Sequence, residues 1–179
     1  MAIKIDKKNF QTPLSVCTYM AAYVGRGPTI ATALEPTPGK GNLVNAVKRL
    51  GGIEVTTPKN DFWKMKHAGK YDFVVMNPPF TPMAQAFEFL EACMPLTDNV
   101  ICLLPWFILI NSDRRFQIIR DYGLVSVTHL PRNTFPSCRI QCVVIEMKRG
   151  YTGSIELKYF DKEYWTGINN TLSTKHMEI

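Results

Sequence analysis

The stretch DFVVMNPPF, from Asp72 to Phe80, decides the fold that the sequence predicts. Its apolar run is typical of a buried strand. The two prolines that follow donate no hydrogen bond to a sheet and are excluded from a helix interior, so the strand is expected to end at Asn77. A core strand therefore runs into a rigid corner, with a polar amide before the prolines and an aromatic ring after them.

Length and composition indicate one globular domain. The chain has 179 residues, of which 46% are hydrophobic and 20% charged, enough to bury a core. The most apolar run, 100–110, is too short to span a bilayer, so no membrane association is expected. Residues 1–10 lack the apolar stretch of a signal peptide, and five cysteines without a CxxC pair favour reduced thiols. These features predict a cytoplasmic protein, and three scattered histidines predict no metal site.

The charge balance is compatible with a polyanionic partner, although many basic domains simply have basic surfaces. A net charge of +6 and a pI near 9.1 are compatible with nucleic acid. Two basic clusters are candidates for binding phosphates, although such clusters are more often solvated surface. They comprise Lys64, Lys66, His67 and Lys70 between two expected strands, and Arg114, Arg115 and Arg120 on an expected helix.

Periodicity predicts an α/β fold. Helices are expected at 13–24, 43–50, 83–96 and 112–123, and strands at 29–34, 53–57, 71–76, 100–109, 124–130, 139–148 and 154–160. Ser112 is the expected N-cap of the fourth helix, and the strand at 100–109 is expected to leave the sheet at Pro105. The last two strands alternate well enough to be antiparallel neighbours, and the polar tail after Trp165 is expected to be disordered.

Strands that alternate with helices, followed by strands alone, predict a doubly wound, Rossmann-like sheet. It is expected to be mostly parallel with antiparallel edge strands, in a single domain over residues 1–179 with its core at about 9–160. Ligands of such sheets bind beyond the carboxyl ends of the strands. Two unusual loops fall there: EPTPGKGN at 35–42, and the NPPF corner.

The loop at 35–42 fits a nucleotide-like cofactor. Gly39 and Gly41 allow close approach of the backbone to a ligand, and the following helix offers its N-terminal N–H groups. The loop is neither a P-loop nor the GxGxxG motif of dinucleotide-binding folds.

The NPPF corner fits an amino group. Pro78 and Pro79 fix two φ angles and so direct the Pro78 carbonyl and the Asn77 side chain toward one point. Two acceptors beside Phe80 match a planar group that stacks on the ring and donates both hydrogens of an NH₂. Gripping that group favours pyramidal nitrogen and frees its lone pair for attack. The alternative is a rigid strand terminator without a chemical role; the glycine-rich loop nearby favours the functional interpretation.

NPPF after a hydrophobic strand, with EPTPGKG upstream, resembles the S-adenosylmethionine-dependent amino-methyltransferases. More specifically, it is similar to the adenine DNA methyltransferases whose cofactor motif precedes the catalytic motif. Three further stretches resemble the family's N-terminal TP element, its adenine-contacting acidic motif and its last catalytic segment: FQTPLSVCTYM at 10–20, DFWKM at 61–65 and LPRNTFPSCRIQCVVIEMKRG at 130–150. The resemblance covers about residues 9–149 in the family's order.

The resemblance implies transfer of a methyl group from S-adenosylmethionine to the exocyclic amino group of adenine in DNA, with the base flipped out of a duplex. The implied catalytic residues are Asn77, Pro78, Pro79 and Phe80. The implied cofactor residues are Thr12, Pro13, Glu35, Thr37, Gly39 and Gly41, with Asp61 and Phe62 bracketing the cofactor's adenine.

Two features depart from the family. Only 10 positions separate Gly51 from Asp61, so the second or third strand is expected to be shortened. Glu54, the candidate ligand of the cofactor ribose, lies inside its strand rather than at its end. The stretch after the catalytic segment is too short for a target-recognition domain. Sequence recognition is therefore expected to come from a partner subunit or from a loop, or to be absent. A methyltransferase acting on an RNA base, one acting on a protein glutamine amide, and a non-catalytic subunit remain open alternatives.

Overall fold

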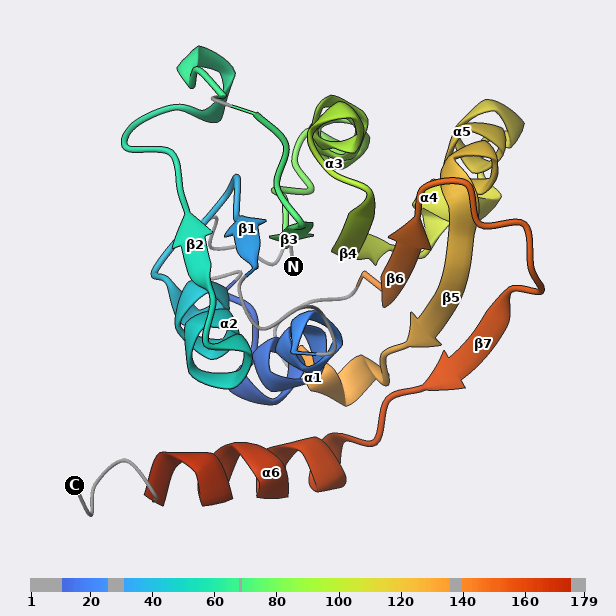
Figure 1. Cartoon of the computed structure of the whole chain (residues 1–179). Helices are drawn as coiled ribbons and strands as arrows, with labels where there is room; N and C mark the ends of the chain where they lie inside the picture. Colours follow the sequence, from blue (N-terminus) through green and yellow to red (C-terminus); the bar gives the residue numbers. More distant parts are fainter. Residues whose placement is uncertain (1–10, 26–30, 68, 136–139, 175–179) are drawn as a thin grey trace, which may run out of the picture.

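The computed structural model describes residues 11–25, 31–67, 69–135 and 140–174. They form an α/β fold, in which one β-sheet is covered by helices on both faces (Figure 1). Within these residues the sheet has 7 strands in the order β2-β1-β3-β4-β6-β5-β7. The strands are β1 (Thr32–Leu34), β2 (Glu54–Thr56), β3 (Phe73–Met76), β4 (Asn99–Pro105), β5 (Leu124–His129), β6 (Cys142–Lys148) and β7 (Glu156–Tyr159).

Helices pack on the two faces of this sheet. They are α1 (Leu14–Val24), α2 (Asn42–Gly51), α3 (Met83–Cys93), α4 (Phe107–Ile110), α5 (Asp113–Gly123) and α6 (Lys162–Thr174), with 3₁₀ turns η1 (Phe62–Lys64), η2 (Met94–Leu96) and η3 (Arg132–Thr134). Figure 1 shows α1, α2 and α6 on one face and α3, α4 and α5 on the other.

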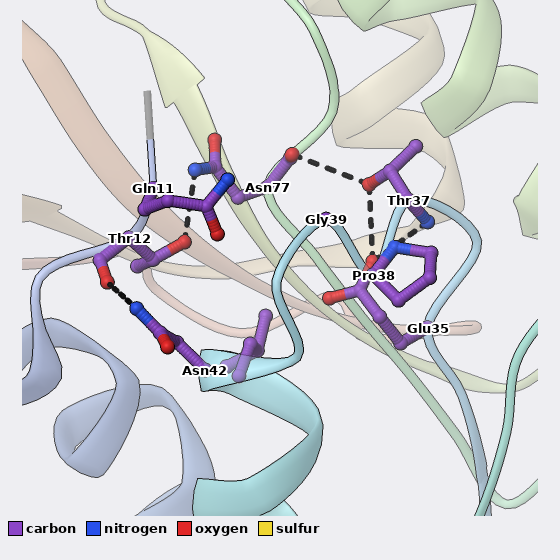
Figure 2. A pocket seen from close by; sticks show the side chains of 9 residues that line it. Gln11, Thr12, Glu35, Thr37, Pro38, Gly39, Asn42 and Asn77 are labelled. Atoms are coloured by element: carbon purple, nitrogen blue, oxygen red, sulfur yellow. Dashed lines mark hydrogen bonds between the residues drawn. The ribbon is translucent and has the colours of Figure 1, made fainter. Parts of the chain in front are cut away.

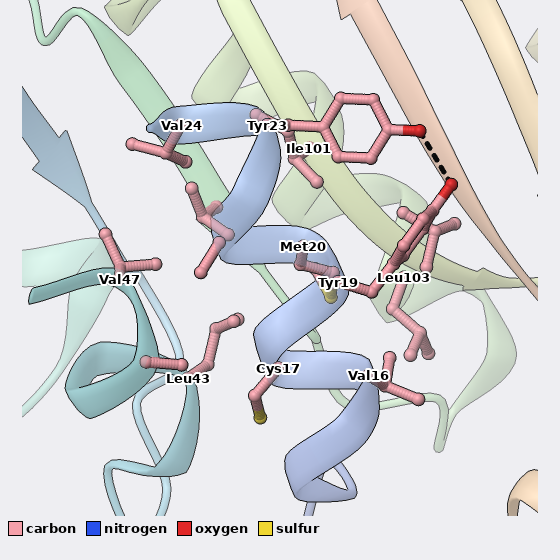
Figure 3. Close-up of a cluster of buried hydrophobic side chains, with 14 of the residues drawn as sticks. Val16, Cys17, Tyr19, Met20, Tyr23, Val24, Leu43, Val47, Ile101 and Leu103 are labelled. Carbon is pink, nitrogen blue, oxygen red and sulfur yellow. Dashed lines mark hydrogen bonds between the residues drawn. The ribbon is translucent and has the colours of Figure 1, made fainter. Parts of the chain in front are cut away.

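The core is divided by the sheet into two hydrophobic clusters. Val75 of β3 faces the cluster of α1 and α2, shown in Figure 3, whereas its neighbours Val74 and Met76 face that of α3 and α5. All four residues of β3 are buried, as expected for a strand covered on both faces. The apolar run before the NPPF corner is therefore a central core strand, as its sequence predicts.

The strand directions confirm the predicted mixed sheet. The pairs β1–β2, β1–β3 and β3–β4 are parallel, and β6 runs antiparallel to both β4 and β5. β7 pairs with β5 in parallel. The prediction that the strands at 139–148 and 154–160 are antiparallel neighbours is wrong, because β5 lies between β6 and β7. Alternation does not identify the partner of either strand, and β6 contributes residues to the clusters on both faces of the sheet.

The sequence predicts both ends of α5 correctly, with Ser112 as the N-cap and Gly123 at the end. Ser112 Oγ accepts a hydrogen bond from the Arg115 backbone N–H at 3.4 Å, and the helix ends at Gly123. The strand predicted at 100–109 ends at Pro105, and the chain then forms the short helix α4. Residues 107–110 are apolar because Ile108 and Leu109 pack into the core as a helical turn.

The prediction of a disordered tail after Trp165 is wrong as far as Thr174, and residues 175–179 lie outside the described part of the chain. Residues Lys162–Thr174 form α6, which packs on α1. Trp165 meets Tyr19 edge to face, with 5.1 Å between ring centroids. Asn169 is buried, and its Oδ1 accepts from Thr18 Oγ1 at 3.2 Å and from Arg49 Nη2 at 2.9 Å. The contact of Asn169 is made by polar side chains, so the polar composition of this segment gives no sign that it packs on α1.

The cysteines, histidines and helices of the described residues add three findings. Cys17, Cys93, Cys102 and Cys142 are buried, unbridged thiols. No three His, Cys, Asp or Glu side chains gather there as a metal site would require, and no helix there is both long and apolar enough to cross a membrane. The absence of a signal peptide at 1–10, the beginning of the strand expected at 29–34 and the state of Cys138 are predictions that lie outside the described residues.

The packing of α6 generates a stability prediction. Asn169→Ala removes the oxygen that accepts from Thr18 Oγ1 and Arg49 Nη2, so we expect the free energy of unfolding to fall by about 1–3 kcal/mol in urea denaturation. Gly167→Ala on the same helix adds a methyl group that meets no atom within 4 Å, and should raise stability by about 0.5–1 kcal/mol. Unchanged stability in both variants would contradict the packed helix.

Candidate active site

Two loops meet at the carboxyl ends of the central strands. The glycine-rich loop at 35–41 follows β1, and the NPPF corner follows β3. Because β1 and β3 are adjacent and parallel, with Leu34 opposite Val74, both loops leave the sheet at the same edge. Thr37 Oγ1 of the first loop lies 3.2 Å from the backbone oxygen of Asn77 in the second. The sheet therefore places the predicted cofactor loop beside the predicted catalytic corner.

A pocket opens between these loops and the chain before α1 (Figure 2). It is lined by Gln11, Thr12, Glu35, Thr37, Pro38, Gly39, Asn42, Leu43 and Asn77. Five residues that the sequence predicts for one site line this one pocket: Thr12, Glu35, Thr37, Gly39 and Asn77. Gln11 and Asn42 also line it, but the sequence analysis does not predict them. Gln11 directly precedes the TP element and Asn42 is the first residue of α2, and these positions are the signals that could have identified them.

The glycine-rich loop has the backbone conformation that only glycine adopts readily. Gly39 has φ +52° and Gly41 φ +85°, the left-handed region in which a Cβ is strained. A Cβ on Gly39 would also lie 3.1 Å from Gln11 Nε2. The Gln11 side chain accepts a hydrogen bond from the Lys40 backbone N–H at 3.0 Å. These contacts fix the loop and direct the N-terminus of α2, which begins after Gly41, toward the pocket.

Asn77 is held by the chain that precedes α1. Its Nδ2 donates to Thr12 Oγ1 at 2.9 Å, and Thr12 is 6% exposed. Asn42 Nδ2 in turn donates to the Thr12 backbone oxygen at 3.3 Å. Since the amide nitrogen donates to Thr12, the carboxamide presents its oxygen as an acceptor, and Figure 2 shows that oxygen pointing away from Thr12.

Glu35 is a buried carboxyl at the base of the pocket. It is 2% exposed, and Oε1 accepts from the Thr37 backbone N–H at 2.8 Å and lies 3.0 Å from Thr37 Oγ1. Burial raises the pKa of this carboxyl to about 8, although the bonds from Thr37 oppose the shift. Glu35 is thus protonated near neutral pH, and a cationic ligand in the pocket would favour its ionised form.

The remaining residues of the corner and the TP element do not line this pocket. Pro78 is buried, Pro79 is exposed, and Phe80 is half-buried against both core clusters. Pro13 is the residue before α1, where its fixed φ suits a helix start.

Asp61 and Phe62 do not line the pocket. Asp61 Oδ1 accepts from the Trp63 backbone N–H at 3.1 Å and so caps η1. The Phe62 ring is buried against Phe89 of α3, with 5.4 Å between centroids.

The sheet is short on the side of the glycine-rich loop, as expected. β2 has three residues and ends the sheet, with no strand beyond it in the described part of the chain. Glu54 begins β2 opposite Thr32 and is exposed. It therefore lies at the amino end of the strand, away from the edge where the pocket opens.

The two basic clusters are partly neutralised at the surface. Lys64 lies 3.8 Å from Asp61, Lys70 lies 3.4 Å from Asp98, and Arg120 lies 2.8 Å from Asp121. Exposed pairs of this kind contribute little to stability.

Comparison with solved structures identifies the class of the fold. A putative class I S-adenosylmethionine-dependent methyltransferase from Listeria monocytogenes matches 96% of this chain over 72% of its own length, with a TM-score of 0.70 and 15% sequence identity. The fold is that of a class I methyltransferase. No family profile and no curated protein sequence matches the chain.

Restriction-modification proteins share this methyltransferase fold. The methyltransferase subunit of a type I system from Streptococcus thermophilus matches 92% of the chain, with a TM-score of 0.71 and 16% identity. The M protein of the type I restriction enzyme EcoKI matches 83%, with a TM-score of 0.63 and 12% identity. The chain spans 53% and 45% of these two proteins, respectively.

The burial of Glu35 generates a pH prediction. Below pH 4.5 this carboxyl is protonated in both the folded and unfolded states; between pH 4.5 and about 8 only the folded state keeps the proton. The free energy of unfolding should therefore fall as pH rises through this window, by up to about 1.4 kcal/mol per pH unit. Glu35→Gln is neutral throughout, so the difference in free energy of unfolding between this variant and the wild type should grow in favour of the variant across the window. Above about pH 8 the difference should stay constant.

Urea denaturation from pH 4 to 9 measures this difference. Glu91→Gln, on an exposed position of α3, is the matched control and should follow the wild type. A stability difference between Glu35→Gln and the wild type that does not change with pH would contradict the raised pKa.

Proposed function

We propose that this chain is an S-adenosylmethionine-dependent methyltransferase that modifies the exocyclic amino group of adenine in DNA. The observation that carries the proposal is the junction of the glycine-rich loop with the NPPF corner. Asn77 lines the same pocket as Glu35, Thr37 and Gly39, so a donor held by the loop and an amino group held by the corner would lie side by side. Positioning two reactants in this way is a major source of rate enhancement.

The residues present fit this cofactor. S-adenosylmethionine carries a cationic sulfonium and an ammonium group, and when bound it supplies an electrophilic methyl group. A buried carboxyl at the base of the pocket suits a cation, and ionisation of Glu35 on binding would strengthen that attraction. Thr12, Pro13, Thr37, Gly39 and Gly41 would hold the cofactor's amino-acid and ribose parts. Asp61 and Phe62 are proposed to bound its adenine, with Phe62 held by its packing on Phe89.

The corner would act on the target base through fixed dipoles. The Asn77 oxygen and the Pro78 carbonyl would accept both hydrogens of the amino group, while Pro79 restrains the backbone and Phe80 stacks on the ring. As the nitrogen attacks the methyl group it gains positive charge, and these acceptors stabilise that charge. The cofactor would supply the methyl group and keep the electron pair of its C–S bond, and the amino group would lose one proton to solvent while the Asn77 and Pro78 oxygens hold the nitrogen. No covalent intermediate with the protein is required.

DNA is the substrate that the comparisons favour. Two of the matched structures are the methyltransferase subunits of type I restriction-modification systems, and the positive net charge suits a nucleic acid. Both proteins are longer than the region matched, so sequence recognition is proposed to come from a partner subunit or from other segments. RNA remains the alternative nucleic-acid substrate.

A non-catalytic role is the second candidate, and the shortened cofactor side favours it. β2 ends the described sheet, and Glu54 lies at the wrong end of that strand to reach a cofactor ribose. The two candidates differ in one property: the enzyme binds S-adenosylmethionine, whereas a subunit that has lost the cofactor site does not.

Methyl transfer from labelled S-adenosylmethionine tests the enzyme. We expect label to enter adenine in duplex DNA, and Asn77→Ala to reduce transfer by about 100-fold or more, since one acceptor of the developing charge is lost. Cofactor binding should be retained in that variant, with a loss of affinity much smaller than the loss of transfer, because Asn77 also holds Thr12 beside the pocket. Asn45→Ala, on an exposed position of α2, is the matched control and should retain activity.

The assay also separates the alternatives. Label in RNA or protein but not in DNA would replace the substrate assignment. Binding of the cofactor with full activity in Asn77→Ala would contradict the role of the corner. Absence of cofactor binding by the wild type would leave the non-catalytic role.

A further inference from the structure

The outer edge of the sheet at β7 is open and apolar. In the described part of the chain β7 pairs with β5 alone, and Figure 1 shows no helix or strand on its outer side. Ile155, Leu157 and Tyr159 are 44%, 76% and 71% exposed. They alternate along the strand, so their side chains share one face. An open edge strand with such a face is a template for another strand.

The backbone pattern shows which residues could pair there. The Phe160 backbone N–H donates to the His129 carbonyl of β5 at 3.0 Å, so Phe160 directs its backbone groups inward. Because backbone groups alternate sides along a strand, Lys158 and Glu156 also face β5. Ile155, Leu157 and Tyr159 therefore direct their N–H and C=O groups toward the open edge.

We propose that two copies of this chain pair through β7, antiparallel, about a two-fold axis at Leu157. In this arrangement Leu157 exchanges two backbone hydrogen bonds with Leu157 of the partner subunit, and Ile155 does the same with Tyr159 of the partner subunit. Glu156 then lies opposite Lys158 of the partner subunit. All three outward-facing residues are paired, and the apolar side chains of both copies meet on one face of a continuous sheet.

Charge selects this register over its neighbours. Only registers that pair outward-facing residues with one another satisfy the backbone, which places the axis at Glu156, Leu157 or Lys158. An axis at Glu156 would set Glu156 against its own copy, and an axis at Lys158 would oppose two lysines. Glu156 and Lys158 lie at positions that do not hydrogen-bond to the opposite strand, and at such positions the side chains of the two strands come closest. Only the axis at Leu157 places opposite charges together.

The ionised side chains are already held on the required face. Lys158 Nζ lies 2.9 Å from Glu156 Oε2 and 3.7 Å from Glu146 Oε2, and its ammonium lies over the Tyr23 ring at 5.3 Å. Pairing would extend this into a cluster shared by two copies. β7 is separated from β3 by β4, β6 and β5, so the pocket of each copy remains open. A pairing this short buries less than the roughly 1,600 Å² of a standard stable interface, so the dimer is expected to depend on concentration.

Sedimentation velocity over a concentration series of the full chain tests the pairing. The wild type should shift from monomer to dimer as concentration rises. Leu157→Arg, which places two cations at the axis, and Glu156→Lys, which opposes cations at two positions, should both remain monomeric at every concentration. Ile110→Arg changes an exposed isoleucine on α4 (59% exposed) and should dimerise as the wild type does. Unchanged thermal melting of the variants would confirm that each is folded.

Oxidative cross-linking tests the register. In Leu157→Cys the two thiols face each other across the axis at a Cα separation of about 5.5 Å, within the range of a disulfide. This variant should form a reducible covalent dimer, whereas Glu156→Cys and the wild type should not. A wild type that stays monomeric, a dimer that survives Leu157→Arg, or equal cross-linking of both cysteine variants would overturn the proposal.

Discussion

The hydrogen bond from Asn77 Nδ2 to Thr12 Oγ1 joins the segments on which the site depends. Asn77 also receives, at its backbone oxygen, the Thr37 hydroxyl of the glycine-rich loop. The chain before α1, the loop after β1 and the corner after β3 are thereby held around one pocket. Proline fixes the backbone on one side of Asn77, and a buried strand fixes it on the other. The carboxamide therefore has a set direction before any ligand binds, which is the condition for stabilisation by preorganised dipoles.

This arrangement requires the central parallel strands. Because β1 and β3 are adjacent and parallel, their carboxyl ends open at one edge, and helices on both faces leave that edge as the accessible one. The burial of Glu35 follows from the same geometry, since it directly succeeds Leu34 at the end of a core strand. Its raised pKa is thus a consequence of the fold that also supplies a group responsive to a cationic ligand.

Local signals in the sequence predicted most of the elements as far as β7 and several residues that line the candidate pocket. The apolar run before NPPF, the glycines at 39 and 41 and the Ser112 cap act through nearby atoms, so residue type and spacing were sufficient. The partner of β7 and the packing of α6 depend on contacts between distant residues. Asn169 with Thr18 is one such contact, and nothing in a polar tail indicates it. The packing of Phe62 of η1 on Phe89 of α3 is another contact between distant residues, and the DFWKM motif gives no sign of it.

The central claim is that the loop and the corner form a cofactor site, and calorimetric titration with S-adenosylmethionine tests it most directly. The wild type should bind, and Gly39→Ala should bind at least about tenfold more weakly, because the methyl group is strained at φ +52° and meets Gln11 beside the pocket. Gly52→Ala, at φ +60° with no atom within 4 Å and at the far end of α2, imposes similar strain away from the pocket and should leave affinity unchanged. Absence of binding by the wild type, or equal losses in the two variants, would contradict the account.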